Sequence, residues 1–395
     1  MSFRHPPVLA NIPRFPQPTQ LLSPVPIPAL TVPGAADANA NSLQSVTFMN
    51  RREFLSTAAT ATAVLSTPLG MRAADASRRI PIGFLGATYS HGPEKIKLAM
   101  SSPDWEFVGV CDSTDSGRAG CEKLGAKLIS QDELFHRARV VAVESDVRDH
   151  ASHALLALKA GKHVHLEKPP ATKLAEMREL VALAREKKLL LQTGFMWRYN
   201  PGFTAIFDAM RKGWLGDVFL VRGYISNNLA PARRPEWGEF EGGSMFELGS
   251  HLVDATVRLL GKPKAVSPFV RHHGKFADSL KDNNVAVLEY DRATAVLINT
   301  ALQPGGAPPR SFEVLGTNGT ATLQPIEPPT LTLDLAKSAG PYKKGTQNVP
   351  LPAYQRYEGD FAELAAAVRG ERALSVSLEE ELLVAETVLR VSEML

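Results

Sequence analysis

The sequence has few cysteines and lacks the motifs of several enzyme classes. Only Cys111 and Cys121 occur in 395 residues, which excludes a framework of disulfides. No spacing of histidine and cysteine converges on a metal, since His163 and His165 alternate across a predicted strand. No nucleophile elbow and no phosphate-binding P-loop occurs either. We therefore expect neither a disulfide-rich scaffold nor a metal centre.

Charge imbalance and long apolar runs are also missing. Residues 1–76 hold five basic and three acidic residues, so the remainder carries 39 against 38, a net charge of +1. A near-neutral body offers no electrostatic footprint for nucleic acid or for an anionic membrane. No stretch reaches the roughly 20 apolar residues that a membrane helix needs. We expect a small-molecule partner, no nucleic acid and no stable membrane association.

The N-terminal segment has the composition of a targeting sequence. Residues 1–48 contain nine of the 29 prolines, no lysine and one acidic residue, which predicts disorder. In residues 49–76, twin arginines after Met49 precede a short apolar run and an alanine-rich stretch, an arrangement that resembles a twin-arginine (Tat) signal peptide. We expect translation to start at Met49 and the mature protein to be periplasmic or otherwise exported. A chance arginine pair before a small apolar helix is the alternative.

Beyond Arg79 the pattern alternates between apolar runs typical of buried strands and stretches with helical spacing. This alternation predicts an α/β fold whose parallel sheet has helices on both faces. The expected strands are Ile80–Leu85, Trp105–Cys111, Val140–Val143, His163–Leu166 and Leu189–Gly194. The expected helices begin at about Pro93 and cover His150–Ala160 and Ala171–Lys187.

The loop after the first expected strand departs from the dinucleotide-binding fingerprint. Glycines would stand at positions 86, 88 and 91, but only Gly86 fits, while Thr88 and His91 replace the others. The helix that follows still presents free N–H groups to a pyrophosphate. We therefore expect Gly86, Thr88, Ser90 and His91 to line a cofactor, although a plain strand-to-helix turn explains the loop about as well.

Asp112 ends the second expected strand, 26 residues after Gly86. A carboxylate there can accept hydrogen bonds from the adenosine ribose hydroxyls and repels a 2′-phosphate. The position therefore favours NAD over NADP as the cofactor. A turn-forming aspartate without a ligand is the alternative.

Residues 157–169, which read ALKAGKHVHLEKP, resemble the signature of the glucose–fructose oxidoreductase, inositol dehydrogenase and MocA (Gfo/Idh/MocA) family. The resemblance extends over nearly all of the chain after Arg79. Further matches are Arg198–Pro201, Gly213–Gly216, Gly242–Asp254 and Val314–Thr320.

The resemblance implies two domains: an N-terminal Rossmann-fold domain over residues 79–196, and a C-terminal α+β domain with a mostly antiparallel open sheet over residues 197–395. The second domain would form the substrate wall and the surface of a homo-oligomer, a dimer or a tetramer. The implied enzyme is an NAD(P)-dependent dehydrogenase or reductase acting on CH–OH groups of a sugar, cyclitol or related polyol.

The family's catalytic lysine and its Asp-x-x-x-His pair correspond to Lys168, Glu247 and His251. We expect His251, near its unperturbed pKa, to take the hydroxyl proton. Lys168, buried beside the nicotinamide, would have a lowered pKa and stabilise the developing alkoxide. Its neighbour Glu167 and Lys168 itself would also contact the cofactor.

Glu247 departs from the family's aspartate and has two explanations. Glu247 and His251 are four residues apart, so they would share one helix face and the carboxylate would orient the imidazole. Alternatively, Ser244 and Glu247 form a capping box at the start of the helix. The sequence leaves both open.

A second departure places Glu144, Ser145 and Asp146 where the family has Thr-Pro-Asn, so that Glu144 would lie near the nicotinamide ribose. This departure leaves room for altered cofactor affinity or a modified reaction.

Three residues are candidates for the substrate wall. Arg198 could touch substrate, with structural pairing as an equal alternative. Trp237 could form an apolar platform for a sugar or pack under its own loop. Asp254 lies near the face of His251, and supporting the helix is its more frequent role.

Three functions are therefore compatible with the sequence. The first is an exported oxidoreductase that transfers a hydride between NAD(H) and a secondary hydroxyl or ketone of a sugar-like compound. The second is an NAD-dependent glycosidase that oxidises its substrate transiently. The third is a non-catalytic binding protein on a dinucleotide scaffold.

Overall fold

The computed structural model describes residues 79–307 and 309–395. The predicted Tat signal and the segment 1–48 lie outside the described residues. The first described element is a parallel sheet in the order β2-β1-β3-β4-β5. Its strands are β1 (Ile80–Leu85), β2 (Trp105–Cys111), β3 (Val140–Val143), β4 (His163–Leu166) and β5 (Leu191–Thr193). Side chains of β1 and β3 enter apolar core clusters on both faces of the sheet, because helices cover both sides, and this confirms the predicted Rossmann-type architecture.

The connections in this half are helical and short. They are α2 (Gly92–Ser101), α3 (Asp115–Leu124), α4 (Gln131–Arg137), α5 (His150–Lys159) and α6 (Leu174–Glu186). The turn from β1 to α2 depends on Gly86, whose φ is +83° and where an added Cβ would lie 2.5 Å from Ser145. Only glycine therefore lets this loop close onto the segment after β3.

The second sheet has eight strands in the order β13-β12-β11-β10-β6-β9-β8-β7. They are β6 (Val218–Ser226), β7 (Ala265–Arg271), β8 (Asn283–Glu289), β9 (Thr294–Thr300), β10 (Ser311–Gly316), β11 (Gly319–Leu323), β12 (Leu331–Leu335) and β13 (Gly345–Val349). The β6–β9 pair is parallel and the other pairs in this sheet are antiparallel, which confirms the mostly antiparallel open sheet.

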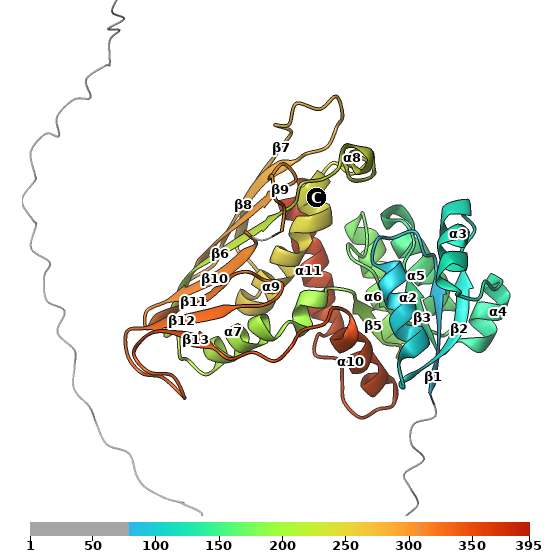
Figure 1. The fold of residues 1–395 in the computed structure, drawn as a ribbon, viewed down its shortest axis with the longest axis horizontal. Coiled ribbons are helices and arrows are strands. Elements are labelled where there is room, and N and C mark those ends of the chain that lie inside the picture. Colours follow the sequence, from blue (N-terminus) through green and yellow to red (C-terminus); the bar gives the residue numbers. More distant parts are fainter. Residues whose placement is uncertain (1–78, 308) are drawn as a thin grey trace, which may run out of the picture. The chain divides into compact units, whose positions relative to one another are not determined.

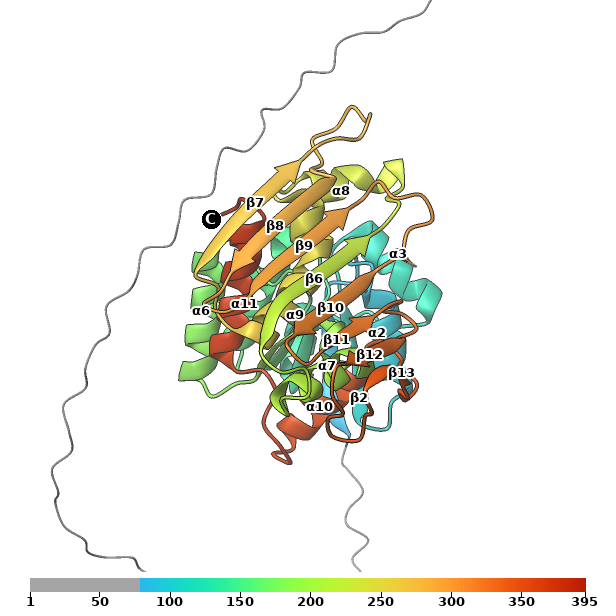
Figure 2. The same cartoon turned by 90° about the vertical axis from the view of Figure 1, so that its left-hand side faces the viewer.

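Helices gather on one face of this sheet, and its opposite face is open toward the viewer in Figure 2 (Figures 1 and 2). Burial alternates along β8 and β9, as expected for strands with one face in the core. The helices of this half are α7 (Pro201–Arg211), α8 (Arg234–Gly238) and α9 (Ser250–Leu260).

The last two helices return toward the first sheet. Phe361 and Leu364 of α10 (Glu358–Val368) share a core cluster with Ile82 and Phe84 of β1. Helix α11 (Leu378–Val391) packs against both α6 and α9. The predicted boundary between residues 196 and 197 stays a prediction, since the C-terminal helices contact both halves.

Within the described ranges, 79–307 and 309–395, no helix combines the length and the apolar character needed to cross a membrane.

Candidate functional site

Lys168 and Glu247 meet next to the end of β4, although they lie far apart in the sequence. The Lys168 Nζ donates to the backbone oxygen of Glu247 at 2.9 Å and to its carboxylate Oε1 at 3.0 Å. Both residues are buried, with 2% and 4% of their surface exposed. A buried ammonium and a buried carboxylate need such a partner, since either charge alone would lose its hydration without compensation.

The backbone around Glu247 explains why it points to Lys168. Residues Met245–Gly249 form a π-helical turn that runs into α9, so the i+4 spacing of an α-helix does not apply at Glu247. The structure shows no hydrogen bond between Glu247 and His251, both of which lie in the described part of the chain. The predicted carboxylate–imidazole contact is therefore absent.

The capping-box explanation of Glu247 is wrong. Ser244 has helical backbone angles and its side chain caps no backbone N–H. Its Oγ instead bonds the side chain of Asn299 at 2.5 Å and accepts from Asn284 at 2.9 Å. The carboxylate of Glu247 is thus free of the helix start and available to the site.

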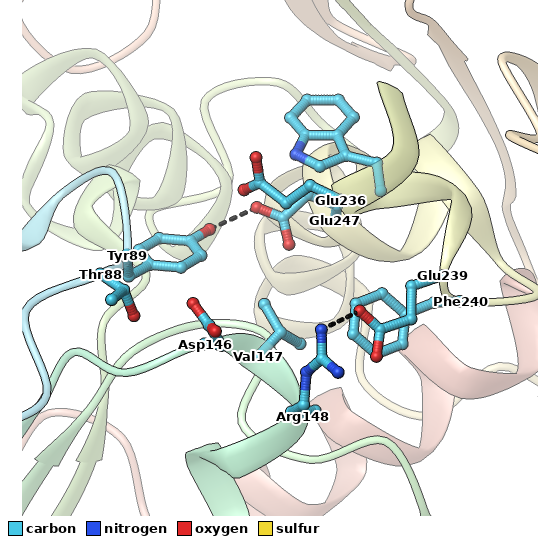
Figure 3. Close-up of a pocket in the computed structure, with 10 residues that line it drawn as sticks. Thr88, Tyr89, Asp146, Val147, Arg148, Glu236, Glu239, Phe240 and Glu247 are labelled. Atoms are coloured by element: carbon cyan, nitrogen blue, oxygen red, sulfur yellow. Dashed lines mark hydrogen bonds and ion pairs between the residues drawn. The ribbon is translucent and has the colours of Figure 1, made fainter. Parts of the chain in front are cut away.

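Tyr89 is a site residue that the sequence did not reveal. Its hydroxyl donates to Oε1 of Glu247, as Figure 3 shows, and its ring centroid lies 5.2 Å from the Lys168 Nζ. The ring also contacts the imidazoles of His91 and His150 at centroid distances of 5.0 and 5.6 Å. Burial, and then the charge of Glu247, raise the pKa of Tyr89 well above its ordinary value, so the phenol stays a neutral donor.

His251 lies in an aromatic pocket near Lys168. Its ring is 4.9 Å from that of Trp197 and 5.8 Å from that of Phe195. Burial, and then the positive charge of Lys168, lower the pKa of His251 well below 6.5. The expectation of a near-unperturbed histidine is therefore wrong, and His251 is neutral at neutral pH. Its buried Nδ1 has no hydrogen-bond partner among the described residues.

Lys95 is a second unpredicted residue and forms the centre of a buried charge cluster. Its Nζ donates to Glu144 Oε1 at 2.7 Å and to Glu167 Oε2, and all three residues are fully buried. Both carboxylates contact this ammonium in the interior, and their predicted contact with the cofactor stays a prediction.

The pKa values of the two carboxyls in this cluster shift in opposite directions. Burial raises the pKa of Glu144 to about 8 against the opposing charge of Lys95, and the negative charge of Glu167 adds to the rise. Burial acts in the same direction on Glu167, but the charges of Lys95 and then His91 outweigh it and hold its pKa well below the ordinary value. The Lys95 ammonium therefore favours the ionised form of Glu167 more strongly than that of Glu144.

Glu144, His165 and Glu167 are close enough to ligate one cation. Lys95 already lies among them, because His165 Nε2 is 3.0 Å from its Nζ. Burial, and then the charge of Lys95, lower the pKa of His165 to about 3, so its neutral ring accepts from Lys95 and donates through Nδ1 to Gln192 at 2.9 Å. The Lys95 ammonium supplies the positive charge that a metal would bring.

A cavity of about 310 Å³ lies at the ends of β1, β2 and β3, where a Rossmann domain binds its nucleotide. Gly86, Thr88 and Asp112 line it, as predicted for cofactor residues. Asp112 accepts the backbone N–H of Ala87 through Oδ2 and that of Thr114 through Oδ1, each at 2.7 Å. The cavity and the glycine turn fit a dinucleotide, and Asp112 braces the loop that would hold it.

The remaining predicted loop residues take other positions. Ser90 is exposed just before α2, and its contact with a cofactor stays a prediction. His91 turns inward, with Nδ1 3.2 Å from Glu167 Oε1, and burial lowers the pKa of His91. His91 therefore supports the interior cluster in the structure rather than the loop surface.

Arg198 and Asp254 belong to a buried ion-pair network away from Lys168. Arg198 donates to Asp254 Oδ1 at 2.7 Å and to Glu381 of α11 at 2.6 and 2.8 Å. Their side chains are 1% and 3% exposed. Because their charges are paired with each other and with Glu381, the structure favours the structural alternative, and their contact with substrate stays a prediction.

A second cavity, of about 130 Å³, joins the Tyr89–Glu247 contact to the loops of the second half (Figure 3). Trp237 lines it and is 5% exposed, which suits the predicted apolar wall. Thr88 and Asp146 border both cavities, so the two are neighbours. The other lining residues are Tyr89, Val147, Arg148, Glu236, Glu239, Phe240 and Glu247.

Two family models cover most of the described chain. Residues 80–195 match the oxidoreductase family with an NAD-binding Rossmann fold, and residues 203–322 match the GFO/IDH/MocA C-terminal domain. The chain belongs to the GFO/IDH/MocA family. Of the three residues that correspond to the family's catalytic set, Lys168 and Glu247 are in direct contact.

Individual relatives agree with this assignment. The dTDP-3,4-didehydro-2,6-dideoxy-alpha-D-glucose 3-reductase of Streptomyces violaceoruber is 28% identical over 303 residues, 74% of this chain and 86% of the relative. The D-glucoside 3-dehydrogenase of Escherichia coli (strain K12) is 30% identical over 208 residues, 50% of this chain and 58% of the relative. An oxidoreductase from Agrobacterium radiobacter, solved with NAD+, L-tartaric acid and magnesium, has the same fold at a TM-score of 0.69 and 15% identity, covering 80% and 96% of the two chains.

The protein is therefore an NAD(P)-dependent oxidoreductase. Its cavity at the ends of β1, β2 and β3 lies where Rossmann domains bind their nucleotide. Its Lys168–Glu247 pair lies where the Rossmann half meets the second half of the chain.

Proposed function

We propose that this GFO/IDH/MocA protein transfers a hydride between NAD(H) and a secondary hydroxyl or ketone of a sugar, cyclitol or related polyol. The observation that carries the proposal is the buried contact of Lys168 with Glu247 beside the substrate-side cavity. Support for the substrate class comes from the relatives, whose names specify a glucoside dehydrogenase and a deoxyglucose reductase.

The dinucleotide, when bound, supplies the hydride acceptor or donor for the reacting carbon. Gly86, Thr88 and Asp112 would hold it in the cavity at the ends of β1, β2 and β3. The carboxylate of Asp112 repels a 2′-phosphate, so the site favours NAD over NADP. This preference is part of the proposal.

Three side chains bind, deprotonate or position groups at the reacting hydroxyl of the substrate. The Lys168 ammonium donates a hydrogen bond to the reacting oxygen and stabilises negative charge on it. His251 is neutral, because burial lowers its pKa, and its unpaired Nδ1 can receive the hydroxyl proton. Glu247 fixes the ammonium in place through Oε1. Trp237 offers an apolar wall to the sugar ring.

We expect NAD to raise the melting temperature of the purified protein, because only the folded protein binds the nucleotide. NADP should raise it less, because Asp112 repels the 2′-phosphate. With NAD, at least one alcohol from a panel of sugars, glycosides and cyclitols should yield reduced nicotinamide, read by its absorbance. A protein that neither gains stability from NAD nor reduces it with any alcohol would refute the proposed function. Turnover without net reduction of NAD would favour the transient-oxidation glycosidase instead.

The open face of the eight-stranded sheet suits assembly into a homo-oligomer. Phe269 of β7 is 51% exposed and pairs across the sheet with Val285, which in turn pairs with Ile298 of β9. These apolar side chains lie on the face of the sheet opposite the core, and Figure 2 shows no helix in front of their strands. Such an apolar surface suits burial against a second copy, and we propose a dimer or a tetramer.

Export through the twin-arginine pathway, to the periplasm or beyond, is also proposed. Its support is the sequence pattern after Met49. One preparation tests export and assembly together: protein purified from the exported fraction should begin near residue 77 and have a molar mass of two or four chains. An intact Met49 in the cell interior would contradict export, and a monomer would contradict assembly.

A further inference from the structure

Tyr89 and Glu247, 158 positions apart in the sequence, are in direct contact. Tyr89 lies between β1 and α2, in the loop where Thr88 and His91 replace two glycines of the fingerprint. Glu247 stands where the family has an aspartate. The sequence offers no link between them, whereas the structure joins them by a buried hydrogen bond from the Tyr89 hydroxyl to Glu247 Oε1 (Figure 3).

The carboxylate of Glu247 is held by one oxygen and free at the other. Oε1 accepts from both Tyr89 and Lys168, and the Lys168 Nζ also holds the backbone oxygen of Glu247. Oε2 is buried and has no hydrogen-bond partner in the described part of the chain. A buried carboxylate oxygen without a partner is costly unless a ligand supplies a donor. The arrangement therefore presents Oε2 as an acceptor for a hydroxyl.

The length of the glutamate side chain matters for this arrangement. Lys168 anchors the main chain of Glu247 at a fixed distance, so the carboxylate position depends on the side chain alone. An aspartate is one methylene shorter, about 1.5 Å, and would withdraw its carboxylate from the Tyr89 hydroxyl. Tyr89 and Glu247 are thus matched to each other.

We propose that Tyr89 is a positioning residue, whose hydroxyl fixes Glu247 against Lys168 and leaves Oε2 to receive a hydrogen bond from a second hydroxyl of the substrate. This inference rests on the proposed function. It narrows the substrate class to compounds with a hydroxyl next to the reacting carbon, as in sugars and cyclitols.

The test compares Tyr89→Phe, Glu247→Asp and the double variant with the wild type. The substrate is the alcohol from the panel that gives the highest rate with NAD. Tyr89→Phe removes the hydrogen bond to Glu247, and Glu247→Asp withdraws the carboxylate from Tyr89, so each is expected to lower kcat about tenfold while the Kd of NAD changes less than about twofold. Because both changes break the same contact, the kcat of the double variant should be no more than about twofold below that of the less active single variant.

The matched control is Tyr199→Phe. Tyr199 donates to Glu363 at 2.6 Å, so this variant loses an equivalent tyrosine–glutamate bond outside the site. Its kcat should stay within about twofold of the wild type.

Two results would overturn the role of Tyr89: a wild-type kcat for Tyr89→Phe, or single effects that multiply in the double variant. Glu247→Asp keeps Tyr89 and the negative charge, so it tests the reach of the side chain even if Tyr89→Phe fails to fold. A second comparison tests the role of the adjacent hydroxyl with an alcohol that lacks it. Glu247→Asp should turn over this alcohol almost as fast as the wild type does. A wild-type enzyme with no turnover would instead refute the proposed function and, with it, this role.

Discussion

Replacing Lys168 with methionine is expected to lower kcat by about a hundred- to a thousandfold. The reason is the loss of the only ammonium placed against Glu247 among the described residues, and with it the donor that stabilises charge on the reacting oxygen. NAD should still raise the melting temperature, since the residues that line the nucleotide cavity are unchanged. Steady-state rates and thermal unfolding measure the two effects separately.

Two further variants separate catalysis from folding. Lys168→Met leaves the buried carboxylate of Glu247 without its ion pair, which destabilises the fold, and adding Glu247→Gln should recover that stability without recovering turnover. Lys127→Met removes a lysine whose partner, Glu133, lies at 2.8 Å on the surface, and it should leave kcat unchanged. A Lys168→Met enzyme with near wild-type kcat would show that the reaction occurs elsewhere.

Replacing Lys95 with methionine is expected to lower the free energy of unfolding by about 3–5 kcal/mol. Lys95 neutralises the ionised carboxylate of Glu167 in an interior where neither side chain is exposed, so its loss leaves a buried charge unpaired. The measurement is urea unfolding followed by circular dichroism.

The companion variants test the cause. Lys95→Met combined with Glu167→Gln removes both charges and should recover a large part of the lost stability. Lys127→Met should change stability by less than about 1 kcal/mol, as an exposed pair does. A loss below about 1 kcal/mol for Lys95→Met would show that the cluster does not depend on its ammonium.

The sequence predicted most of the fold because the fold depends on local patterns. The runs Ile80–Leu85 and Val140–Val143 are continuous and apolar, and Glu106 is the one charged residue in Trp105–Cys111, as a parallel sheet with two covered faces requires. The fifth expected strand, Leu189–Gly194, is shorter in the structure at Leu191–Thr193, since strand ends depend on pairing rather than composition.

The site was predicted only where a motif marked it. Lys168 and His251 follow from family motifs, and the fold brings Lys168 to Glu247. Tyr89 and Lys95 carry no local signal, because their importance comes from partners 49 to 158 positions away. The direction of a side chain decides such contacts, and periodicity alone does not specify it.

Buried ion pairs involve two of the predicted site residues. Arg198 lies after the crossover, where a substrate contact is possible, yet its guanidinium donates to Glu381 of the last helix. Glu144 lies after β3, where a ribose contact is expected, yet its carboxyl accepts a hydrogen bond from Lys95. In both cases a partner of opposite charge, distant in the sequence, satisfies a group that would otherwise be free to meet a ligand.

The central claim is that this chain exchanges a hydride between a carbon-bound hydroxyl and NAD at the Lys168 site. The most direct measurement uses an alcohol of the panel that carries deuterium on the carbon bearing the reacting hydroxyl, with mass spectrometry of the nucleotide after turnover. We predict deuterium in the reduced nicotinamide ring with the wild type, and a rate of label transfer at least about a hundredfold lower with Lys168→Met. Reduced nicotinamide without the label, or equal label transfer in the two proteins, would contradict it.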